Sequence, residues 1–289
     1  MIADIWTTIV EMLDYTFIQR ALVVGLLVSV CASLLGVSLV LKRYAMIGEG
    51  LSHVGFGSLA IATALNAAPL QVSIPIVVLA AFLLLRISEN GKIKGDAAIA
   101  IISSSSLAIG VVVVSQTTGM NTDVCNYLFG SILAMSRSDV YLSVALAIVV
   151  LTLFVVFYQK IFAVTFDENF AKATGVKTSF YSMVVAFLTA ITITLGMRMM
   201  GALLISSLVV FPALSSMRIC KKFRSVTICA AIISVLCFVI GVIMSYFYVI
   251  PTGASVVLVN IAVFVLFWIL RFLSVQSKKR ANKKKEVIS

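Results

Sequence analysis

The chain has 289 residues, of which 62% are hydrophobic and 11% are charged, and its mean hydropathy is +1.16. A soluble domain does not need so much apolar surface, whereas an integral membrane protein does, because its lipid-facing positions are apolar as well as its buried ones. The net charge of +11 would suit a nucleic-acid-binding domain. Here the basic residues flank apolar segments, which indicates membrane topology and no nucleic-acid partner.

Nine apolar segments are long enough to cross the ~30 Å hydrocarbon core of a bilayer. We expect spans at roughly 17–41, 47–66, 70–87, 97–116, 139–159, 179–197, 201–217, 226–248 and 253–273. The stretch 179–217 is nearly continuous, and we divide it where Gly196 and Gly201 flank Arg198. The stretch 117–138 is ambiguous between a short helix and a re-entrant segment. The predicted fold class is an all-α, polytopic transmembrane helix bundle of about eight or nine spans.

The second predicted span carries the sharpest chemical signal of the chain. His53 is the single histidine of the sequence, and Glu49 precedes it by four residues. Side chains at i and i+4 project from the same helix face. Ionisable groups at membrane depth are costly and mark ion pathways, and this pair suits zinc, manganese or iron. Small residues at Gly48, Ser52 and Gly55 let another helix approach closely, so we expect the pair to face the bundle interior.

The same pair also has a purely structural interpretation. The positive end of the helix dipole favours an acid such as Glu49 near the start of a span. His53, about 9 Å into the membrane at ~1.5 Å per residue, also fits a hydrogen bond to a neighbouring helix. Two ligands do not complete a metal site, so the others come from elsewhere in the chain, a second subunit or water. The weaker candidates in this chain are Asp123 and Asn126, together with Met120.

Charge sorting gives the expected orientation of the spans. When the first connection, with Lys42 and Arg43, is cytoplasmic, 19 of the 22 basic residues lie inside. Three basic residues remain outside: Arg20, Arg137 and Arg198. Cytoplasmic connections are enriched in Lys and Arg, so we expect an external N-terminus and a cytoplasmic C-terminus. A single transmembrane domain, residues 1–275, is followed by a basic cytoplasmic tail, residues 276–289, near anionic membrane lipid.

A short cytoplasmic helix is predicted between the fifth and sixth spans, at about 165–175. Thr165 and Glu168 match a capping box. Asp167 and Glu168 suit the positive end of the helix dipole. Gly175 supplies a C-terminal stop.

The apolar face of this helix suggests a contact with another molecule. Phe166, Phe170 and Ala173 share one face at spacings of i, i+4 and i+7. One interpretation is a helix that rests on lipid. The other is a docking element for a cytoplasmic protein, with the two phenylalanines as anchors. The acidic residues at its start argue mildly against lipid, because anionic headgroups would repel them.

Six ordered stretches carry a resemblance to a known family. They are residues 43–53, 95–100, 127–133, 166–176, 198–204 and 211–213. Together they resemble the ABC-3 family of permeases, the membrane subunits of bacterial zinc, manganese and iron importers, over about 43–260. The family usually has Asp where this chain has Glu49, which keeps the charge and adds a methylene group.

The resemblance implies the partners and the roles of the residues. It implies a homodimeric, multi-pass permease of the bacterial plasma membrane, seated on a cytoplasmic ATP-binding subunit and supplied by an extracellular metal-binding lipoprotein. Glu49 and His53 would contact the ion within the membrane. The residues that would couple to the ATPase are Phe166, Asp167, Glu168, Phe170 and Gly175.

Motifs for catalysis are missing from the sequence. No GxxxxGK[ST] run occurs, so ATP would be bound and hydrolysed by the partner chain. HExxH is absent, as are paired aspartates of the DDxxD type. We therefore expect a transport subunit that is not an enzyme and binds no permanent cofactor.

The predicted function is import of a divalent transition metal by alternating access, with zinc the first choice and manganese or iron next. The alternative is a secondary metal transporter driven by protons or sodium. That class needs further ionisable groups in the spans, and the sequence has few.

Overall fold

The computed structural model describes residues 11–12, 14–89, 95–117, 130 and 137–286. Within these residues the regular structure is helical, which confirms the predicted all-α fold class. The helices are α2 (Thr16–Leu41), α3 (Ala45–Ala64), α4 (Pro69–Glu89), α5 (Gly95–Thr117), α7 (Arg137–Val156), α8 (Tyr158–Phe166), α9 (Glu168–Ala173), α10 (Thr178–Met200), α11 (Ala202–Ile219), α12 (Phe223–Tyr248) and α13 (Thr252–Glu286).

In the described part of the chain, eight helices are long and apolar enough to cross a membrane. α3 corresponds to the second of the nine predicted spans and has 20 residues, but it is not among the eight. Glu49 and His53 lower its hydropathy. The Glu49–His53 pair thus makes α3 less hydrophobic than the other spans.

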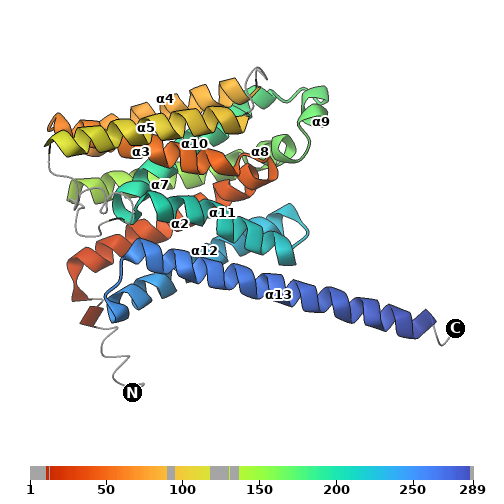
Figure 1. The fold of residues 1–289 in the computed structure, drawn as a ribbon. Coiled ribbons are helices and arrows are strands. Elements are labelled where there is room, and N and C mark those ends of the chain that lie inside the picture. Colours follow the sequence, from red (N-terminus) through yellow and green to blue (C-terminus); the bar gives the residue numbers. More distant parts are fainter. Residues whose placement is uncertain (1–10, 13, 90–94, 118–129, 131–136, 287–289) are drawn as a thin grey trace.

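The long helices run side by side, and their connections alternate between two ends of the bundle (Figure 1). α9 lies at one end, which we call the α9 end, together with the last turns of α13. The connections 42–44 and 220–222 belong to this end. The opposite end holds the connections 65–68 and 249–251 and the break between α10 and α11.

The basic residues follow this division. Those in or beside the connections of the α9 end include Lys42, Arg43, Lys160, Lys172, Lys177, Arg218, Lys221, Lys222 and Arg224. Arg137 and Arg198 lie at the opposite end, where α7 begins and α10 ends. The charge asymmetry predicted from the sequence is therefore an asymmetry of the folded bundle.

The division of the stretch 179–217 falls at Gly201. This residue is both the C-cap of α10 and the N-cap of α11, with φ +85° and ψ 159°. Only glycine adopts this backbone region readily. Gly196, the other glycine of the predicted break, lies inside α10. The split between two spans is thus confirmed and is located at a single residue.

α13 is longer than the predicted last span. It has 35 residues and continues to Glu286, and Figure 1 shows it projecting past the rest of the bundle. The expected boundary between residues 275 and 276 therefore lies inside one continuous helix.

The core lies around α3. This helix packs against α4, α5, α10 and α11, and Leu51, Phe56 and Leu59 are almost fully buried. A Cβ atom added at Gly57 would lie 2.7 Å from the backbone oxygen of Ser106 in α5. The two helices can approach this closely because residue 57 has no side chain. α3 is therefore held on several sides, which fixes the direction of its remaining face.

Candidate functional site

Glu49 and His53 lie in the first turns of α3, near the α9 end. The helix starts at Ala45, directly after its N-cap Tyr44. Glu49 is thus about 6 Å along the helix axis from the first residue, and His53 about 12 Å. The spacing of four residues within one unbroken helix places the carboxylate and the imidazole on one face.

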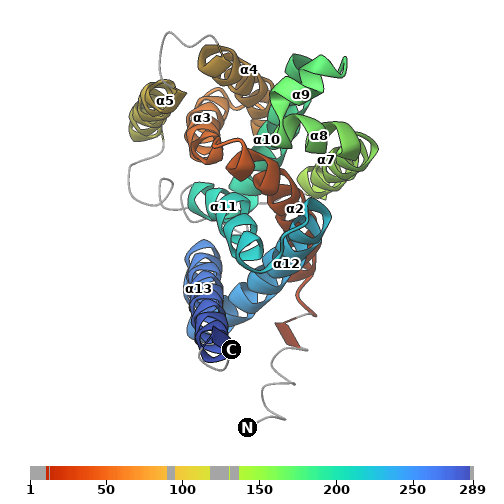
Figure 2. The same ribbon diagram turned by 90° about the vertical axis from the view of Figure 1, so that its right-hand side faces the viewer.

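The glycines next to Glu49 show which way this face points. A Cβ atom at Gly48 would contact Val209 of α11 at 3.7 Å, and one at Gly50 would meet Ile99 of α5 at 2.8 Å. Successive residues are about 100° apart around a helix. Glu49 therefore points between α11 and α5, which lie on two sides of α3 in the end-on view of Figure 2.

The burial of the two side chains differs. Glu49 is exposed on the surface of the single chain, whereas His53 is half-buried. The His53 Nδ1 atom is buried and has no hydrogen-bond partner. Glu49 and His53 thus reach an open face of α3, with one imidazole nitrogen left unsatisfied.

The predicted interior position is therefore wrong for Glu49 within one chain. The stripe of small residues behaves as expected, because Gly48, Ser52 and Gly55 are all buried. Gly55, for example, faces Met197 of α10. Glu49 lies at a different angle around the helix from this stripe, so close packing of the stripe leaves the carboxylate on the uncovered side.

The pair does not find further protein ligands in the described part of the chain. Among those residues, no group of three His, Cys, Asp or Glu side chains is placed to hold a metal ion. The weaker candidates Asp123 and Asn126 lie outside the described residues, as does Met120. As metal ligands, Glu49 and His53 would offer one carboxylate group and one nitrogen, and a complete site would need ligands from elsewhere.

The second candidate site is α9, whose cap differs from the predicted one. Asp167, in an extended conformation, is the N-cap, and its side chain accepts a hydrogen bond from the Phe170 backbone N–H at 2.9 Å. The predicted capping box of Thr165 and Glu168 is wrong, because Thr165 is buried inside α8. A carboxylate at Asp167 caps the helix directly, which frees Glu168 for other contacts.

The predicted stop at Gly175 is confirmed. Gly175 has φ +81°, and its N–H donates to the Lys172 carbonyl at 3.1 Å. The N–H of Val176 donates to the Ala171 carbonyl at 3.0 Å. These two bonds form a Schellman motif, in which glycine supplies the left-handed residue that ends the helix.

Phe166 and Phe170 both project into solvent, with exposed fractions of 75% and 65%. They do not share one helix as predicted, because Phe166 ends α8 and Phe170 belongs to α9. The extended backbone of Asp167 separates the two helices. Two large apolar side chains therefore stand exposed on either side of a bend at the α9 end.

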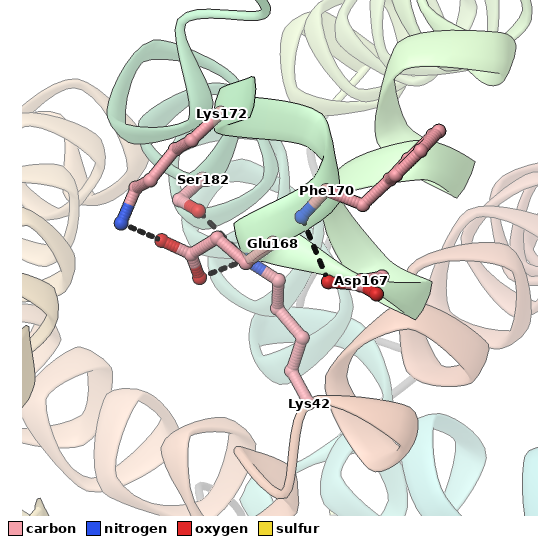
Figure 3. Close-up of polar contacts among 6 residues, drawn as sticks. All are labelled: Lys42, Asp167, Glu168, Phe170, Lys172 and Ser182. Carbon is pink, nitrogen blue, oxygen red and sulfur yellow. Dashed lines mark hydrogen bonds and ion pairs between the residues drawn. The ribbon is translucent and has the colours of Figure 1, made fainter. Parts of the chain in front are cut away.

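Glu168 joins α9 to the rest of the molecule (Figure 3). Its carboxylate lies 2.9 Å from Lys172 Nζ in the same helix and 3.7 Å from Lys42 Nζ in the connection between α2 and α3. Lys42 also donates a 2.7 Å hydrogen bond to Ser182 Oγ of α10. The hydrogen bond from Lys172 is the main cause that lowers the pKa of Glu168, with further lowering by the charge of Lys42.

Sequence reasoning missed the role of Lys42. The spacing of four residues between Glu168 and Lys172 signals their pair. Lys42 lies far from Glu168 along the chain. Its position after a span indicates the membrane orientation but does not indicate which residues it contacts. Sequence reasoning also missed the ion pair between Arg198 and Asp139 at the opposite end. Both of its guanidinium–carboxylate distances are 3.1 Å.

Comparisons with known proteins show the family of the chain. The model of the ABC 3 transport family matches residues 14–271. The chain is 26% identical over 256 residues to the manganese transport system membrane protein MntC of Halalkalibacterium halodurans, covering 89% of this chain and 88% of that protein. It is 32% identical over 247 residues to the high-affinity zinc uptake system membrane protein ZnuB of Haemophilus influenzae, covering 85% and 94%.

A solved structure has the same fold. PsaBC from Streptococcus pneumoniae in complex with Fab matches with a TM-score of 0.82 and 27% identity, covering 93% of this chain and 95% of that chain. The match extends over nearly the whole of both chains.

Proposed function

The chain belongs to the ABC 3 transport family, and we propose that it is the permease through which an ATP-driven importer moves a divalent transition-metal ion. It is a multi-pass membrane subunit and not an enzyme, and ATP hydrolysis belongs to a separate partner. The related proteins are named for manganese and for zinc. Both ions accept the nitrogen and carboxylate oxygen that α3 offers.

The observation that carries the metal path is the open face of α3. A carboxylate at membrane depth is costly unless it faces a polar partner or an aqueous path, and Glu49 is exposed between α5 and α11. His53 beside it has a buried nitrogen without a partner. An ion that exchanges part of its hydration shell for these two ligands would satisfy both groups as it passes.

A second copy of the chain would cover this face. Within the described residues, the pair has no third ligand of its own. A homodimer would bring two such pairs together and provide up to two carboxylates and two imidazoles. The metal path would then run between the copies, shielded from lipid, and alternating access would come from tilting the helices around it.

The α9 end is the proposed seat of the ATP-binding subunit. Phe166 and Phe170 are exposed apolar anchors of the kind that dominate protein interfaces. Asp167 and Gly175 fix the two ends of α9 by the N-cap and the Schellman motif. A short, well-capped helix with exposed phenylalanines can carry a push from a partner into the bundle without unwinding.

The basic α9 end supports one of the two membrane orientations. We place this end and the C-terminus in the cytoplasm of a bacterial cell and the N-terminus outside. The tail from residue 276 onward then lies at the anionic inner leaflet. An extracellular metal-binding lipoprotein would deliver the ion at the opposite end of the bundle.

Metal uptake by cells expressing the permease and its ATPase tests the proposal. Glu49→Gln and His53→Ala should lower uptake of zinc or manganese by roughly tenfold or more, because losing even a hydrogen-bond partner of a metal ligand costs about 10–100-fold. Glu49→Asp, which keeps the carboxylate, is the matched control and should retain most activity. Normal uptake in both Glu49→Gln and His53→Ala, at equal abundance in the membrane, would remove the pair from the metal path.

A further inference from the structure

Lys42 is an unusual cation for the end of a membrane span. Its side chain is only 12% exposed, although a lysine at a cytoplasmic connection normally extends into water. A charge removed from water needs partners that replace its hydration. Here the ammonium group donates to Ser182 of α10 at 2.7 Å and lies 3.7 Å from the Glu168 carboxylate of α9. Lys42 thus contacts two other elements at once.

The backbone around Lys42 is hydrogen-bonded to both helices that it joins: the bonds of a Schellman motif hold it to α2, and the Ile47 N–H of α3 donates to the Tyr44 carbonyl at 3.0 Å. The three residues between α2 and α3 form a Schellman motif, in which Arg43 N–H donates to the Val40 carbonyl at 3.1 Å and Tyr44 N–H to the Leu39 carbonyl at 2.8 Å. Arg43 takes the left-handed residue of this motif, with φ +62°. A connection so short and so fully hydrogen-bonded cannot absorb a displacement of Lys42 by bending. A displacement of Lys42 would therefore reach the first turn of α3 as well as the last turn of α2.

The far end of the same link is the first residue of α9. Glu168 directly follows the N-cap Asp167, so its carboxylate moves with the helix. At the near end, Glu49 lies about 6 Å along α3 from Ala45. Few steps therefore separate the proposed ATPase seat from the proposed metal pair: α9, Glu168, Lys42, and the start of α3.

We propose that Lys42 is a positioning residue that transmits movement of α9 to the metal-binding turn of α3. This inference rests on the proposed function, because it needs a motor that moves α9. When the ATP-binding subunit shifts α9, the Glu168 carboxylate carries the Lys42 ammonium with it. The α2–α3 connection then tilts the start of α3 and changes the direction of Glu49. Lys42 touches no metal; it sets where the ligand points.

Lys172 provides a matched control within the same cluster. It pairs with the same carboxylate, and more closely, at 2.9 Å. It lies in α9 itself, however, with 59% of its side chain exposed, so its pair with Glu168 lies within one helix and moves as a unit with α9. Lys42→Met and Lys172→Met each remove one cation from Glu168. Only the first removes the contact between Glu168 and the α2–α3 connection.

The test is the amount of metal transported per ATP hydrolysed by the assembled transporter in proteoliposomes. Lys42→Met should lower zinc or manganese uptake by roughly tenfold, within the range found for residues that modulate coupling between sites. ATP hydrolysis and binding of the ATPase should stay within about twofold of wild type. Lys172→Met should leave both rates unchanged. Lys42→Arg, which keeps the cation, should restore most of the uptake.

A purely structural role for Lys42 predicts different results. The inference is overturned if Lys42→Met transports as much metal per ATP as wild type, if Lys172→Met has the same effect, or if Lys42→Met acts by releasing the ATPase. Should Lys42→Met fail to insert in the membrane, Glu168→Gln removes the same link from the exposed side and should uncouple in the same way. Failure of the proposed function itself would look different, because the wild-type complex would then show no ATP-dependent metal uptake.

Discussion

Each end of the bundle has its own ion pairs, and the two sets differ in geometry. At the opposite end, Arg198 of α10 and Asp139 of α7 form a two-pronged pair, with both distances 3.1 Å and side chains only 17% and 14% exposed. At the α9 end, one carboxylate, Glu168, is shared by Lys172 and Lys42, with the link between elements the longer of the two. The forked pair fixes the relative geometry of the two side chains. The shared carboxylate of Glu168, in contrast, allows its contacts with the two lysines to change.

This difference matches where movement is needed. A forked arginine–carboxylate pair loses both bonds when its helices slide, so the opposite end resists relative motion of α7 and α10. A compact ammonium group beside a half-exposed carboxylate tolerates small shifts, because its three donors carry no fixed plane. The α9 end, where we place the motor, is therefore the adjustable end. The predictions below test this contrast through stability.

The largest effect is expected at the Arg198–Asp139 pair. Arg198→Met removes both bonds of the fork from the largely buried Asp139 carboxylate, and we expect a loss of about 2–3 kcal/mol in unfolding free energy. Arg198→Lys should recover only part of the loss, since lysine cannot form the fork. Thermal unfolding of the purified protein in detergent measures both. A loss for Arg198→Met no greater than that for Lys42→Met would remove the contrast between the two ends.

The break between α10 and α11 should be the next most sensitive point of the opposite end. Gly201 has φ +85° and ψ 159°, a region that costs other residues about 1–3 kcal/mol. We expect Gly201→Ala to destabilise the protein by about 2 kcal/mol. Gly175→Ala in the α9 end is the comparison variant. Gly175 also has a positive φ, +81°, but its surroundings offer open space for a methyl group. Equal stability of Gly201→Ala and wild type would show that the break is not strained.

Glu168→Gln should have a smaller effect, of about 1 kcal/mol or less, because the carboxylate is half-exposed. The pKa of Glu168 is lowered, first by the hydrogen bond from Lys172. Its contribution is therefore fully present above the unfolded carboxyl pKa of about 4.3 and is lost as pH falls through the lower folded value. The difference in melting temperature between Glu168→Gln and wild type should be constant from about pH 6 to 8 and shrink in acid. A difference that changes between pH 6 and 8 would contradict this account.

The positions of the helices could be predicted from the sequence, whereas most contacts between them could not. Span positions follow from hydropathy, and the stop at Gly175 follows from local backbone geometry, so both are readable from a few neighbouring residues. The N-cap Asp167 was missed because Thr165 offered an equally good local pattern. Only the end of α8 at Phe166 decides between them, and that end depends on tertiary packing.

The candidate metal site shows the same limit of local sequence patterns. The i, i+4 spacing of Glu49 and His53 predicts a common helix face, but the direction of that face depends on where α5 and α11 pack. The small-residue stripe indicated close packing of α3 without showing that Glu49 would lie beyond its edge. The Arg198–Asp139 and Lys42–Glu168 pairs join residues far apart in the sequence, which no local pattern records.

The smallest expected effect concerns backbone strain, which both ends share. Val249, in the connection of the opposite end, has φ +51° and is 91% exposed, and a β-branched residue in this region is a marked outlier. Val249→Gly relieves about 1 kcal/mol or more of strain and gives back part of it through the flexibility of the unfolded chain. We expect a net gain of about 0.5 kcal/mol in unfolding free energy, seen as a slightly higher melting temperature. Arg43→Gly, in the same conformation at the α9 end, should gain a similar amount. A gain at only one end would show that side-chain contacts, and not the shared backbone conformation, distinguish the two connections.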